Sequence, residues 1–339
     1  MTARPAGRSA PTLESVAALA GVSRATAGRV LAGSTTVGEQ AREAVLAAAA
    51  ELSYVTNRAA RSLMTRRSDS IGFVVGEPEE RFFADPHFAL VLRGAHAALA
   101  GHDVQLVFSI LASARDRERF ERFAAGGHLD GVILVSLHGD DPLPQRLQDA
   151  GVPVVLSGRP FRPVDGLAYV DADNTGGARS AVDYLTHRGR ERIATITGPL
   201  DMPAAIDRRD GFLAGLAAHD LAAHGVADGD FTVAGGRRAM SELLAARPGL
   251  DAVFAANDLM AFGAMQAIAE SGRRVPHDVA LVGFDDSPLA ASVHPALTTV
   301  RQPIVAMGEA MAERLIAVIE DGPQAPLVMP TDVVARASA

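Results

Sequence analysis

Polar and charged residues stand directly after several short apolar runs of this 339-residue chain. Arg159 follows one such run, the pair Asn257-Asp258 follows another, and the pair Asp285-Asp286 follows a third. Each of these residues alone is better explained as a helix cap or a surface charge. Together, a guanidinium, carboxylates and an amide can bind the hydroxyl groups of a polyol, because they supply paired donors and acceptors. One interpretation of the pattern is therefore a polyol-binding pocket.

Most enzyme chemistries lack their usual residues in this chain. It contains no cysteine, and all 32 basic residues are arginine, since no lysine occurs. Thiolate zinc sites, iron–sulfur clusters, P-loops and Schiff-base chemistry therefore lack their ligands or nucleophiles. The acidic stretches at 140–141 and 171–173 have no histidine at ligand spacing, and neither a GxSxG motif nor a GxGxxG motif after an apolar run occurs. We therefore expect no enzymatic activity, no metal ion and no cofactor.

The elements that must position the polar residues alternate between strands and helices. Short apolar runs are expected as buried strands at 71–75, 104–108, 132–135, 154–156, 193–196, 252–255 and 279–282. Helical patterns lie between them at 87–100, 176–187, 207–219, 257–270 and 304–320. This alternation predicts an α/β fold with doubly wound parallel sheets, and the length after residue 68 suffices for two lobes. Ligands of such sheets bind beyond the carboxyl ends of the strands, which is where the polar residues stand.

Charge is unevenly distributed along the chain. Residues 1–68 carry nine arginines and four glutamates, a net charge of +5, whereas the remaining residues carry −13. Only the basic segment is therefore expected to approach a polyanion, although a solvated basic surface without a partner explains the charge equally well. No apolar run reaches the roughly 18 residues of a membrane span. Met1–Pro11 lacks the apolar core of a signal peptide, so a cytoplasmic location without membrane contact is expected.

The basic segment is predicted to be all-helical. Apolar residues recur at helical spacing before Gly21, with Thr12 placed as the N-cap. Further helices are expected over Arg24–Leu31 and over Glu39–Leu52. Two helices joined by a glycine turn are typical of a helix-turn-helix, whose second helix can lie in the major groove. An unrelated three-helix interaction module would give the same periodicity.

The residue strings of this segment are more specific than its periodicity. They are Thr12-Leu-Glu-Ser-Val-Ala17, Ala20-Gly-Val-Ser23, Thr26, Arg29-Val-Leu31, Leu52-Ser-Tyr54, Asn57 and Ala60-Arg-Ser-Leu63. In these strings the segment resembles the lactose-repressor (LacI/GalR) family of bacterial transcription regulators. The resemblance implies that the base edges are read by Arg24, Ala25 and Arg29. The two arginines suit this role, since a guanidinium can donate to guanine O6 and N7 together. The resemblance also implies DNA contacts by Thr12, and phosphate anchoring suits Ser23 and Thr26.

Residues 57–64 resemble the hinge helix of that family, which forms on operator DNA and enters the minor groove. By this resemblance Asn57 and Ala60 contact DNA and Leu63 wedges between base pairs. A linker leucine packed on the rest of the protein is the alternative. The chain departs from the family pattern at Gly28, Gly38, Ala41 and Thr56. Gly28 costs about 1 kcal/mol in a helix, and hydroxyl donors to phosphate are missing, so DNA binding is expected to weaken or to use backbone amides.

The resemblance extends through most of the remaining chain. It is carried by Asp85-Pro-His-Phe88, Arg208 three residues before Gly211-Phe212, Ala256-Asn-Asp-Leu-Met-Ala261, Val282-Gly-Phe-Asp-Asp286 and Leu297-Thr-Thr-Val-Arg-Gln-Pro303. It implies two periplasmic-binding-protein-like lobes, with chain crossovers near residues 170, 300 and 325 and an effector in the cleft. The implied pocket resembles that of sugar-binding members more than that of purine-binding members, and it comprises Asp85, His87, Phe88, Arg159, Arg208, Asn257, Asp285 and Gln302.

These observations predict three parts of the chain. Residues 1–56 form a helix-turn-helix DNA-binding domain, residues 57–68 form the hinge helix and linker, and residues 69–339 form an effector-binding and dimerisation domain. Its first lobe covers about 69–170 and 301–324, and its second lobe about 171–300 and 325–339.

The predicted function is that of a sequence-specific, allosteric transcriptional repressor of carbohydrate-utilisation genes. A homodimer is expected on near-palindromic double-stranded operator DNA, because the symmetry of protein and site should match. A mono- or oligosaccharide in the cleft is expected to control operator binding. The alternatives are a cytoplasmic sugar-binding sensor with weakened DNA binding, a purine-responsive regulator and a sugar-modifying enzyme with a basic N-terminal module.

Overall fold

A computed structural model describes residues 11–31, 34, 36–54 and 67–339 of the protein. The chain divides into two compact units, Met1–Ser68 and Asp69–Ala339, called the head and the body below. The predicted hinge helix, with Asn57, Ala60 and Leu63, lies outside the described residues. None of the helices in the described ranges combines the length and the apolar character that a bilayer span requires.

The head contains the three predicted helices, α1 (Leu13–Leu19), α2 (Arg24–Leu31) and α3 (Glu39–Glu51). Helix α1 begins with a reciprocal capping box. The Thr12 hydroxyl accepts a hydrogen bond from the Ser15 amide at 3.2 Å, and the Ser15 hydroxyl accepts one from the Thr12 amide at 2.9 Å. Gly21 adopts φ +67° in the turn, as predicted for a left-handed stop. The helices bury a small common core of Val16, Ala17, Ala27, Val30, Val45, Ala48 and Ala49.

The first lobe of the body is a six-stranded, all-parallel sheet in the order β11-β5-β4-β3-β1-β2. The strands are β1 (Ser70–Val75), β2 (Gln105–Ile110), β3 (Gly131–Val135), β4 (Val154–Ser157), β5 (Ala168–Ala172) and β11 (Leu327–Met329). The helical segments are α5 (Glu79–Ala84), α6 (Pro86–Leu99), α7 (Ala114–Phe123), the π-helical turn η1 (Ala124–His128), α8 (Leu143–Asp149) and α14 (Ile304–Asp321).

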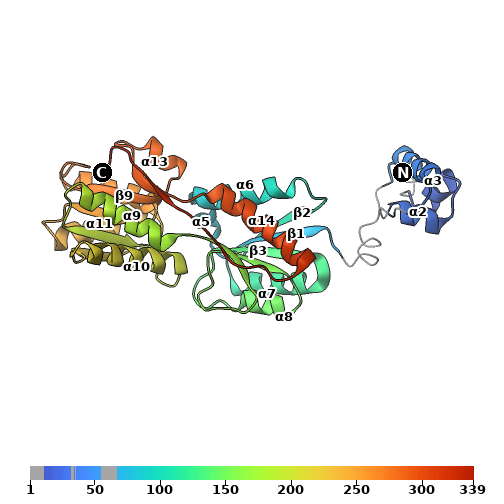
Figure 1. Ribbon diagram of the computed structural model, residues 1–339, viewed down its shortest axis with the longest axis horizontal. Coiled ribbons are helices and arrows are strands. Elements are labelled where there is room, and N and C mark those ends of the chain that lie inside the picture. The colour runs from blue at the N-terminus through green and yellow to red at the C-terminus, as the bar shows by residue number, and fades with distance from the viewer. Residues whose placement is uncertain (1–10, 32–33, 35, 55–66) are drawn as a thin grey trace, which may run out of the picture. The chain divides into compact units, whose positions relative to one another are not determined.

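Both faces of this sheet are covered. Alternate residues of β1 point to opposite faces: Phe73 packs in a core with α6 and α14, and Val74 packs in a core with α7 and α8. Figure 1 displays α6 and the red helix α14 side by side over the strands. Burial on both faces explains why these strands read as continuous apolar runs in the sequence.

The second lobe is a six-stranded sheet in the order β12-β10-β9-β8-β6-β7, in which only β12 is antiparallel. The strands are β6 (Ile193–Thr197), β7 (Gly225–Asp228), β8 (Ala252–Ala255), β9 (Ala280–Asp285), β10 (Thr298–Arg301) and β12 (Asp332–Val334). The helices are α9 (Asn174–His187), α10 (Pro203–Ala218), α11 (Val233–Ala246), α12 (Asp258–Glu270) and α13 (Pro288–Ser292).

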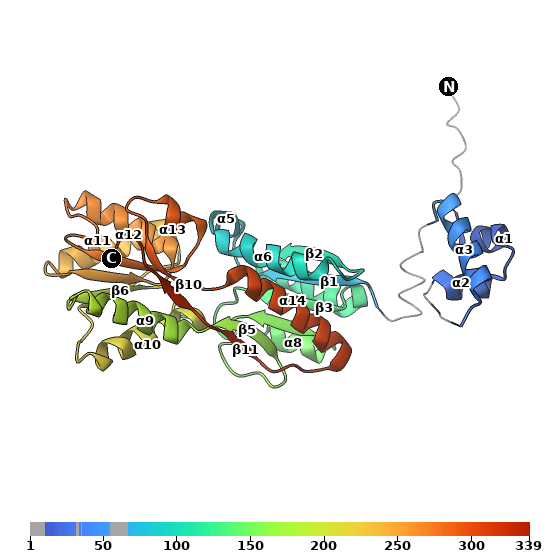
Figure 2. The ribbon, with the colours of Figure 1, turned by 45° about the horizontal axis from the view of Figure 1, so that its top comes forward.

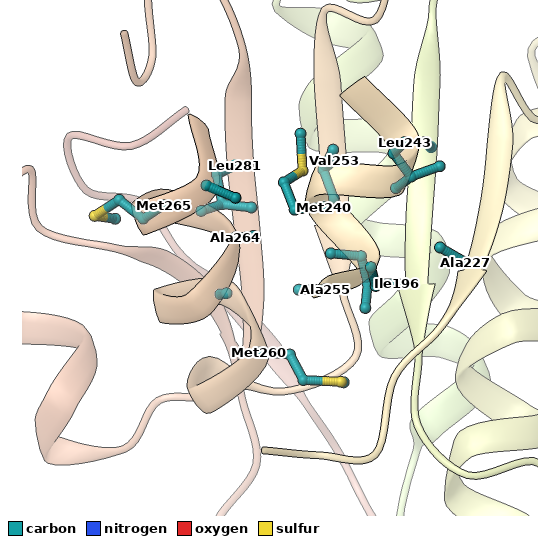
Figure 3. Packing of buried hydrophobic residues seen from close by; sticks show 14 of the residues in the cluster. Ile196, Ala227, Met240, Leu243, Val253, Ala255, Met260, Ala264, Met265 and Leu281 are labelled. Atoms are coloured by element: carbon teal, nitrogen blue, oxygen red, sulfur yellow. The ribbon is translucent and has the colours of Figure 1, made fainter. Parts of the chain in front are cut away.

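The core of the second lobe also has two layers. Figure 3 shows Met240 and Leu243 of α11 beside Ile196 and Val253 of the sheet. On the opposite face α9 and α10 pack around Phe212 and neighbouring residues. The predicted doubly wound α/β architecture is therefore present in both lobes.

The chain crosses three times between the lobes. The first two crossovers lie between β5 and α9 and between β10 and α14. The third was expected near residue 325, and this position is wrong. Leu327–Met329 forms β11 and pairs with β5 in the first lobe, so the crossing lies between Met329 and Asp332. Figure 2 shows the dark red C-terminal segment passing from one lobe to the other.

Candidate functional site

A cavity of about 100 Å³ lies between the lobes, at the carboxyl ends of both sheets. Seven of the eight residues predicted for the effector pocket line it, namely Asp85, His87, Phe88, Arg208, Asn257, Asp285 and Gln302. Asp85, His87 and Phe88 lie at the start of α6 in the first lobe. In the second lobe Arg208 stands on α10, Asn257 caps α12 and Asp285 ends β9, and Gln302 follows β10. The fold thus brings together residues that lie more than two hundred positions apart.

Arg208 occupies the centre of the polar wall. It stands on α10 and is only 5% exposed. Its Nε donates to Asn174 Oδ1 at 2.8 Å, and its Nη1 donates to the carbonyl of Ala256 at 2.6 Å. The guanidinium carbon lies 3.7 Å from the centroid of the Phe284 ring. Because the group is fixed on several sides, its position is set before any ligand arrives.

Asp285 and Gln302 extend this wall along the second sheet. The Gln302 amide donates to Asp285 Oδ1 at 2.6 Å, and Arg208 Nη1 lies 3.5 Å from the same oxygen. Burial raises the pKa of Asp285, whereas the charge of Arg208 acts in the opposite direction. Asp285 also adopts φ +114°, a strained backbone conformation at the edge of the cavity that it lines.

Asn257 and Asp258, which were predicted together, have different roles. Asn257 caps α12 by accepting from the Met260 amide at 2.8 Å, and its Nδ2 donates to the Phe231 carbonyl. Its side chain lines the cavity. Asp258 is buried behind it and accepts from the Thr299 hydroxyl and the Ser287 amide. Burial raises the pKa of Asp258 to about 7.

Asp85, His87 and Phe88 provide the wall on the first lobe. Asp85 caps α6 and accepts from the His87 amide at 2.9 Å. Phe88 is buried and stacks on Phe82, so it contributes an apolar wall from within the core. Burial lowers the pKa of His87, which favours a neutral ring that can both donate and accept at the cavity.

Arg159, the eighth predicted residue, does not line this cavity. Its guanidinium forms two hydrogen bonds with Asp207, from Nε at 2.8 Å and from Nη2 at 2.7 Å. Asp207 stands one residue before Arg208 on α10, so the pair joins the two lobes. Arg159 instead lines an adjoining cavity. The sequence could not indicate this, since the competing carboxylate is 48 residues away.

Sequence reasoning missed Asp171 and Asn174. Asp171 is the last residue but one of β5 and accepts hydrogen bonds from the Asn174 side-chain amide and from the backbone amides of Arg159 and Ala172. Since Asn174 also accepts from Arg208, a continuous polar chain runs from the first lobe to the second. The signal for Asp171 is its position at the end of an apolar run, and an acidic stretch without a nearby histidine does not by itself indicate a pocket.

Arg81 was also missed. It stands on α5 and lines the cavity, with its Nε 3.1 Å from a carboxylate oxygen of Glu77. Its Nη1 donates to the carbonyl of Asp230 in the second lobe, and its guanidinium carbon lies 5.6 Å from the Phe231 ring centroid. Arg81 therefore contacts both lobes directly at the edge of the cavity.

The predicted DNA-reading residues lie at the exposed start and side of α2. Arg24, Ala25 and Arg29 are exposed, and Arg24 Nε lies 3.0 Å from a Glu14 oxygen. The Ser23 hydroxyl accepts from the Thr26 amide at 3.1 Å and is 2.9 Å from the Thr26 hydroxyl. Thr12 and Ser23 thus cap the starts of α1 and α2, and Thr26 lies in the first turn of α2. The exposed guanidinium groups of Arg24 and Arg29 suit phosphate or guanine recognition.

Two family models match the chain. Residues 12–57 match the model of the bacterial regulatory proteins of the lacI family, and residues 182–339 match that of the periplasmic binding protein-like domain. The HTH-type transcriptional regulator CelR of Thermobifida fusca is 47% identical over 336 residues, which cover 98% of this chain and 99% of that protein. The chain belongs to the lacI family.

Solved structures of this family match nearly the whole chain. The transcriptional regulator CelR–cellobiose complex is 45% identical, with a TM-score of 0.78, and the match covers 97% of this chain and 100% of that one. The lac repressor dimer bound to operator and the anti-inducer ONPF is 26% identical, with a TM-score of 0.83, covering 97% and 99%. These relatives are a transcriptional regulator and a repressor. Among the described residues of this chain, no group of three or more histidine, aspartate or glutamate side chains could hold a metal ion.

Proposed function

We propose that this chain is a DNA-binding transcriptional repressor of carbohydrate-utilisation genes, acting in the cytoplasm as a homodimer and controlled by a sugar in the inter-lobe cavity. The observation that carries the proposal is the buried polar chain Asp171–Asn174–Arg208–Asp285, which faces the cavity from both lobes. Fixed carboxylate, amide and guanidinium groups suit a ligand rich in hydroxyl groups. The complex of the related CelR with cellobiose supports a carbohydrate effector.

Control requires only that the sugar prefer one arrangement of the two lobes. The lobes are joined around the cavity by Arg81, by Arg159 and by the Asp171–Asn174 pair. A ligand that replaces or strengthens these contacts therefore changes the relative stability of the alternative lobe arrangements. A coupling of about 1–3 kcal/mol changes operator affinity roughly 5–150-fold.

Recognition of DNA is proposed to rest on the head. Arg24 and Arg29 are proposed to bind guanine edges, with Ala25 against a thymine methyl group. Leu63, from the segment outside the described residues, is proposed to wedge between base pairs of the minor groove. Leu63→Ala should then weaken specific binding much more than non-specific binding, and equal loss of both would refute the wedge.

Selection of random duplex DNA by the purified full chain, at two salt concentrations, tests the proposal. Recovery of a near-palindromic sequence, followed by its release on addition of a sugar, is the expected result. A response to purines and not to sugars would show that the effector is a purine rather than a sugar.

A sensor without strong DNA binding is the second candidate. It is favoured by Gly38, which leaves the start of α3 without a side-chain cap, and by Gly28 inside α2. Recovery of no sequence above background, together with sugar binding, would favour this sensor.

A further inference from the structure

The segment from the end of β9 to the start of α13, Asp285–Ser287, has an unusual backbone. Asp285 adopts φ +114° and Asp286 adopts φ +55°, so two consecutive residues that carry a Cβ have left-handed backbone angles. Such conformations are unfavourable and persist only where surrounding contacts stabilise them. Because Asp285 lines the cavity, the contacts that stabilise this turn also set the position of a cavity residue.

Two buried side chains bind the turn from behind. Thr299 of β10 is 0% exposed, and Asp258 of α12 is 1% exposed. The Ser287 amide donates to Asp258 Oδ2 at 2.7 Å, and the Asp286 amide donates to Thr299 Oγ1 at 3.4 Å. The two backbone amides that follow Asp285 are thus satisfied by side chains, and not by a strand or a helix.

Thr299 and Asp258 also bind each other. The Thr299 hydroxyl donates to Asp258 Oδ1 at 2.6 Å, which leaves its oxygen free to accept from the turn. A Cβ added at Gly283 would meet the same Asp258 oxygen at 2.5 Å. The carboxyl group therefore lies directly against the backbone of β9, two residues before Asp285. The pair connects α12, β9 and β10 behind the cavity wall.

Stability alone does not account for Asp258. A carboxyl group buried this deeply is costly unless a positive charge pairs with it, and the hydroxyl and the amide that donate to it are neutral. Burial accordingly raises the pKa of Asp258 to about 7. Carboxyl groups perturbed in this way cluster at functional sites. Neither Asp258 nor Thr299 is among the residues that line the cavity, so a role in binding must act through Asp285.

We propose that Asp258 and Thr299 are positioning residues for effector binding. They stabilise the turn so that the Asp285 carboxyl group keeps its place 2.6 Å from the Gln302 amide and 3.5 Å from Arg208, and they do not touch the ligand themselves. This inference rests on the proposed function, because it takes Asp285 as part of the effector site.

Thr299→Val tests this role with little change of shape. Valine removes the hydroxyl that links Asp258 to the turn. Titration calorimetry of the full chain with glucose, cellobiose, maltose, xylose and xylobiose first selects the sugar that binds most tightly. The affinity for that sugar should fall about five- to tenfold in Thr299→Val. Thr299→Ser keeps the hydroxyl and should restore the affinity to within about twofold of the wild type.

Thr298→Val is the matched control. Thr298 is also 0% exposed, and it precedes Thr299 on β10, so its side chain points to the opposite face of the sheet. Its hydroxyl accepts from the Arg336 amide at 2.9 Å in the C-terminal segment. This variant should lose a similar amount of thermal stability and keep its sugar affinity within about twofold.

A double-mutant cycle separates positioning from a general loss of structure. If Thr299 acts through Asp285, the protein that combines Thr299→Val with Asp285→Ala should bind the sugar as Asp285→Ala does, within about twofold. Multiplied losses in the double variant, or the same affinity loss in Thr298→Val as in Thr299→Val, would overturn the positioning role and leave the sugar-controlled function intact. Failure of every sugar to bind the wild type would overturn the sugar effector and, with it, this role.

Discussion

The imidazole Nδ1 of His138 lies 3.0 Å from a carboxylate oxygen of Asp201, and this contact joins the two lobes beside the cleft. His138 belongs to the loop after β3, whereas Asp201 precedes α10. A backbone hydrogen bond also joins the lobes at this point, because the Gly139 amide donates to the Asp201 carbonyl at 2.8 Å. On its other side His138 Nε2 lies 3.1 Å from Glu77, which is 3% exposed and also contacts Arg81.

This arrangement predicts that effector binding weakens as the pH rises. The hydrogen bond with Glu77, followed by its charge and by the contact with Asp201, raises the pKa of His138 above its ordinary value of 6.5. Only the protonated ring can donate to both carboxylates. The contact therefore stabilises the described arrangement of the two lobes, with the cavity between them, fully below the ordinary pKa, and this stabilisation is lost as the pH rises through the raised value. Calorimetry should give severalfold tighter sugar binding at about pH 6 than at about pH 8.5.

Substitution of the histidine should isolate this contribution. His138→Gln should lose the part of the pH dependence that His138 contributes, because glutamine does not titrate, whereas any part that comes from Asp258, whose pKa is about 7, should remain. His102→Gln, at an exposed histidine that lines neither cavity, should keep the dependence of the wild type. An unchanged pH dependence in His138→Gln would exclude His138 as the group responsible.

Asp285→Ala is expected to abolish the effector response without loss of DNA binding. The carboxyl group accepts from Gln302 and pairs with Arg208, so its removal leaves the buried Gln302 amide without its acceptor and the buried Arg208 without this carboxylate at the cavity. Sugar affinity should fall about ten- to hundredfold, which corresponds to one hydrogen bond to a charged group. Operator affinity without sugar, measured by fluorescence anisotropy, should stay within twofold.

The neighbouring Asp286→Ala is the matched control. Its carboxylate pairs with Arg301 at 2.7 Å and with Arg336, and it does not line the cavity. This variant should lose thermal stability but retain sugar affinity. An Asp285→Ala protein that responds fully to the sugar would refute the assignment of this pocket.

Local signals in the sequence were sufficient for much of the fold. Thr12 and Gly21 mark the two ends of α1 as predicted, because helix caps and left-handed turns depend on adjacent residues. Strand β11 was not predicted, since a strand of three residues has no periodicity and is formed by pairing with β5, about 155 residues earlier.

Site residues that directly follow strands were predictable from the sequence. Residues whose side chains are bound by a partner elsewhere in the fold were not. Asp285 and Asn257 reach the cavity because the parallel strands before them end at the same edge. Arg159 satisfies the same rule, yet Asp207 binds its guanidinium. Arg81 stands on a six-residue helix whose contact with Asp230 depends on how the lobes close. Such contacts are tertiary and leave no pattern in the sequence.

Gly28→Ala should stabilise the head by about 1 kcal/mol. Gly28 lies within α2, and an added Cβ would meet Leu13 Cδ2 at 3.6 Å, an ordinary van der Waals contact. Hydrogen exchange of the peptide over Arg24–Leu31, measured in the full chain, should slow about fivefold, the factor that matches this free energy. Gly21→Ala is the opposite control, because φ +67° strains any residue with a Cβ. Faster exchange in Gly28→Ala would contradict the prediction.

Arg24→Gln should reduce sequence preference rather than general affinity for DNA. The guanidinium is held 3.0 Å from Glu14 in an exposed pair, which is worth at most about 1 kcal/mol and so can be exchanged for a base contact. Loss of a bidentate contact to guanine should lower affinity for the selected operator about 5–150-fold and relax selection at one base pair. Affinity for random duplex should fall much less. Arg42→Gln, at an exposed arginine on α3, should instead weaken both DNAs alike through the phosphates. If Arg24→Gln behaves as Arg42→Gln does, Arg24 contacts the phosphates and another residue reads the base.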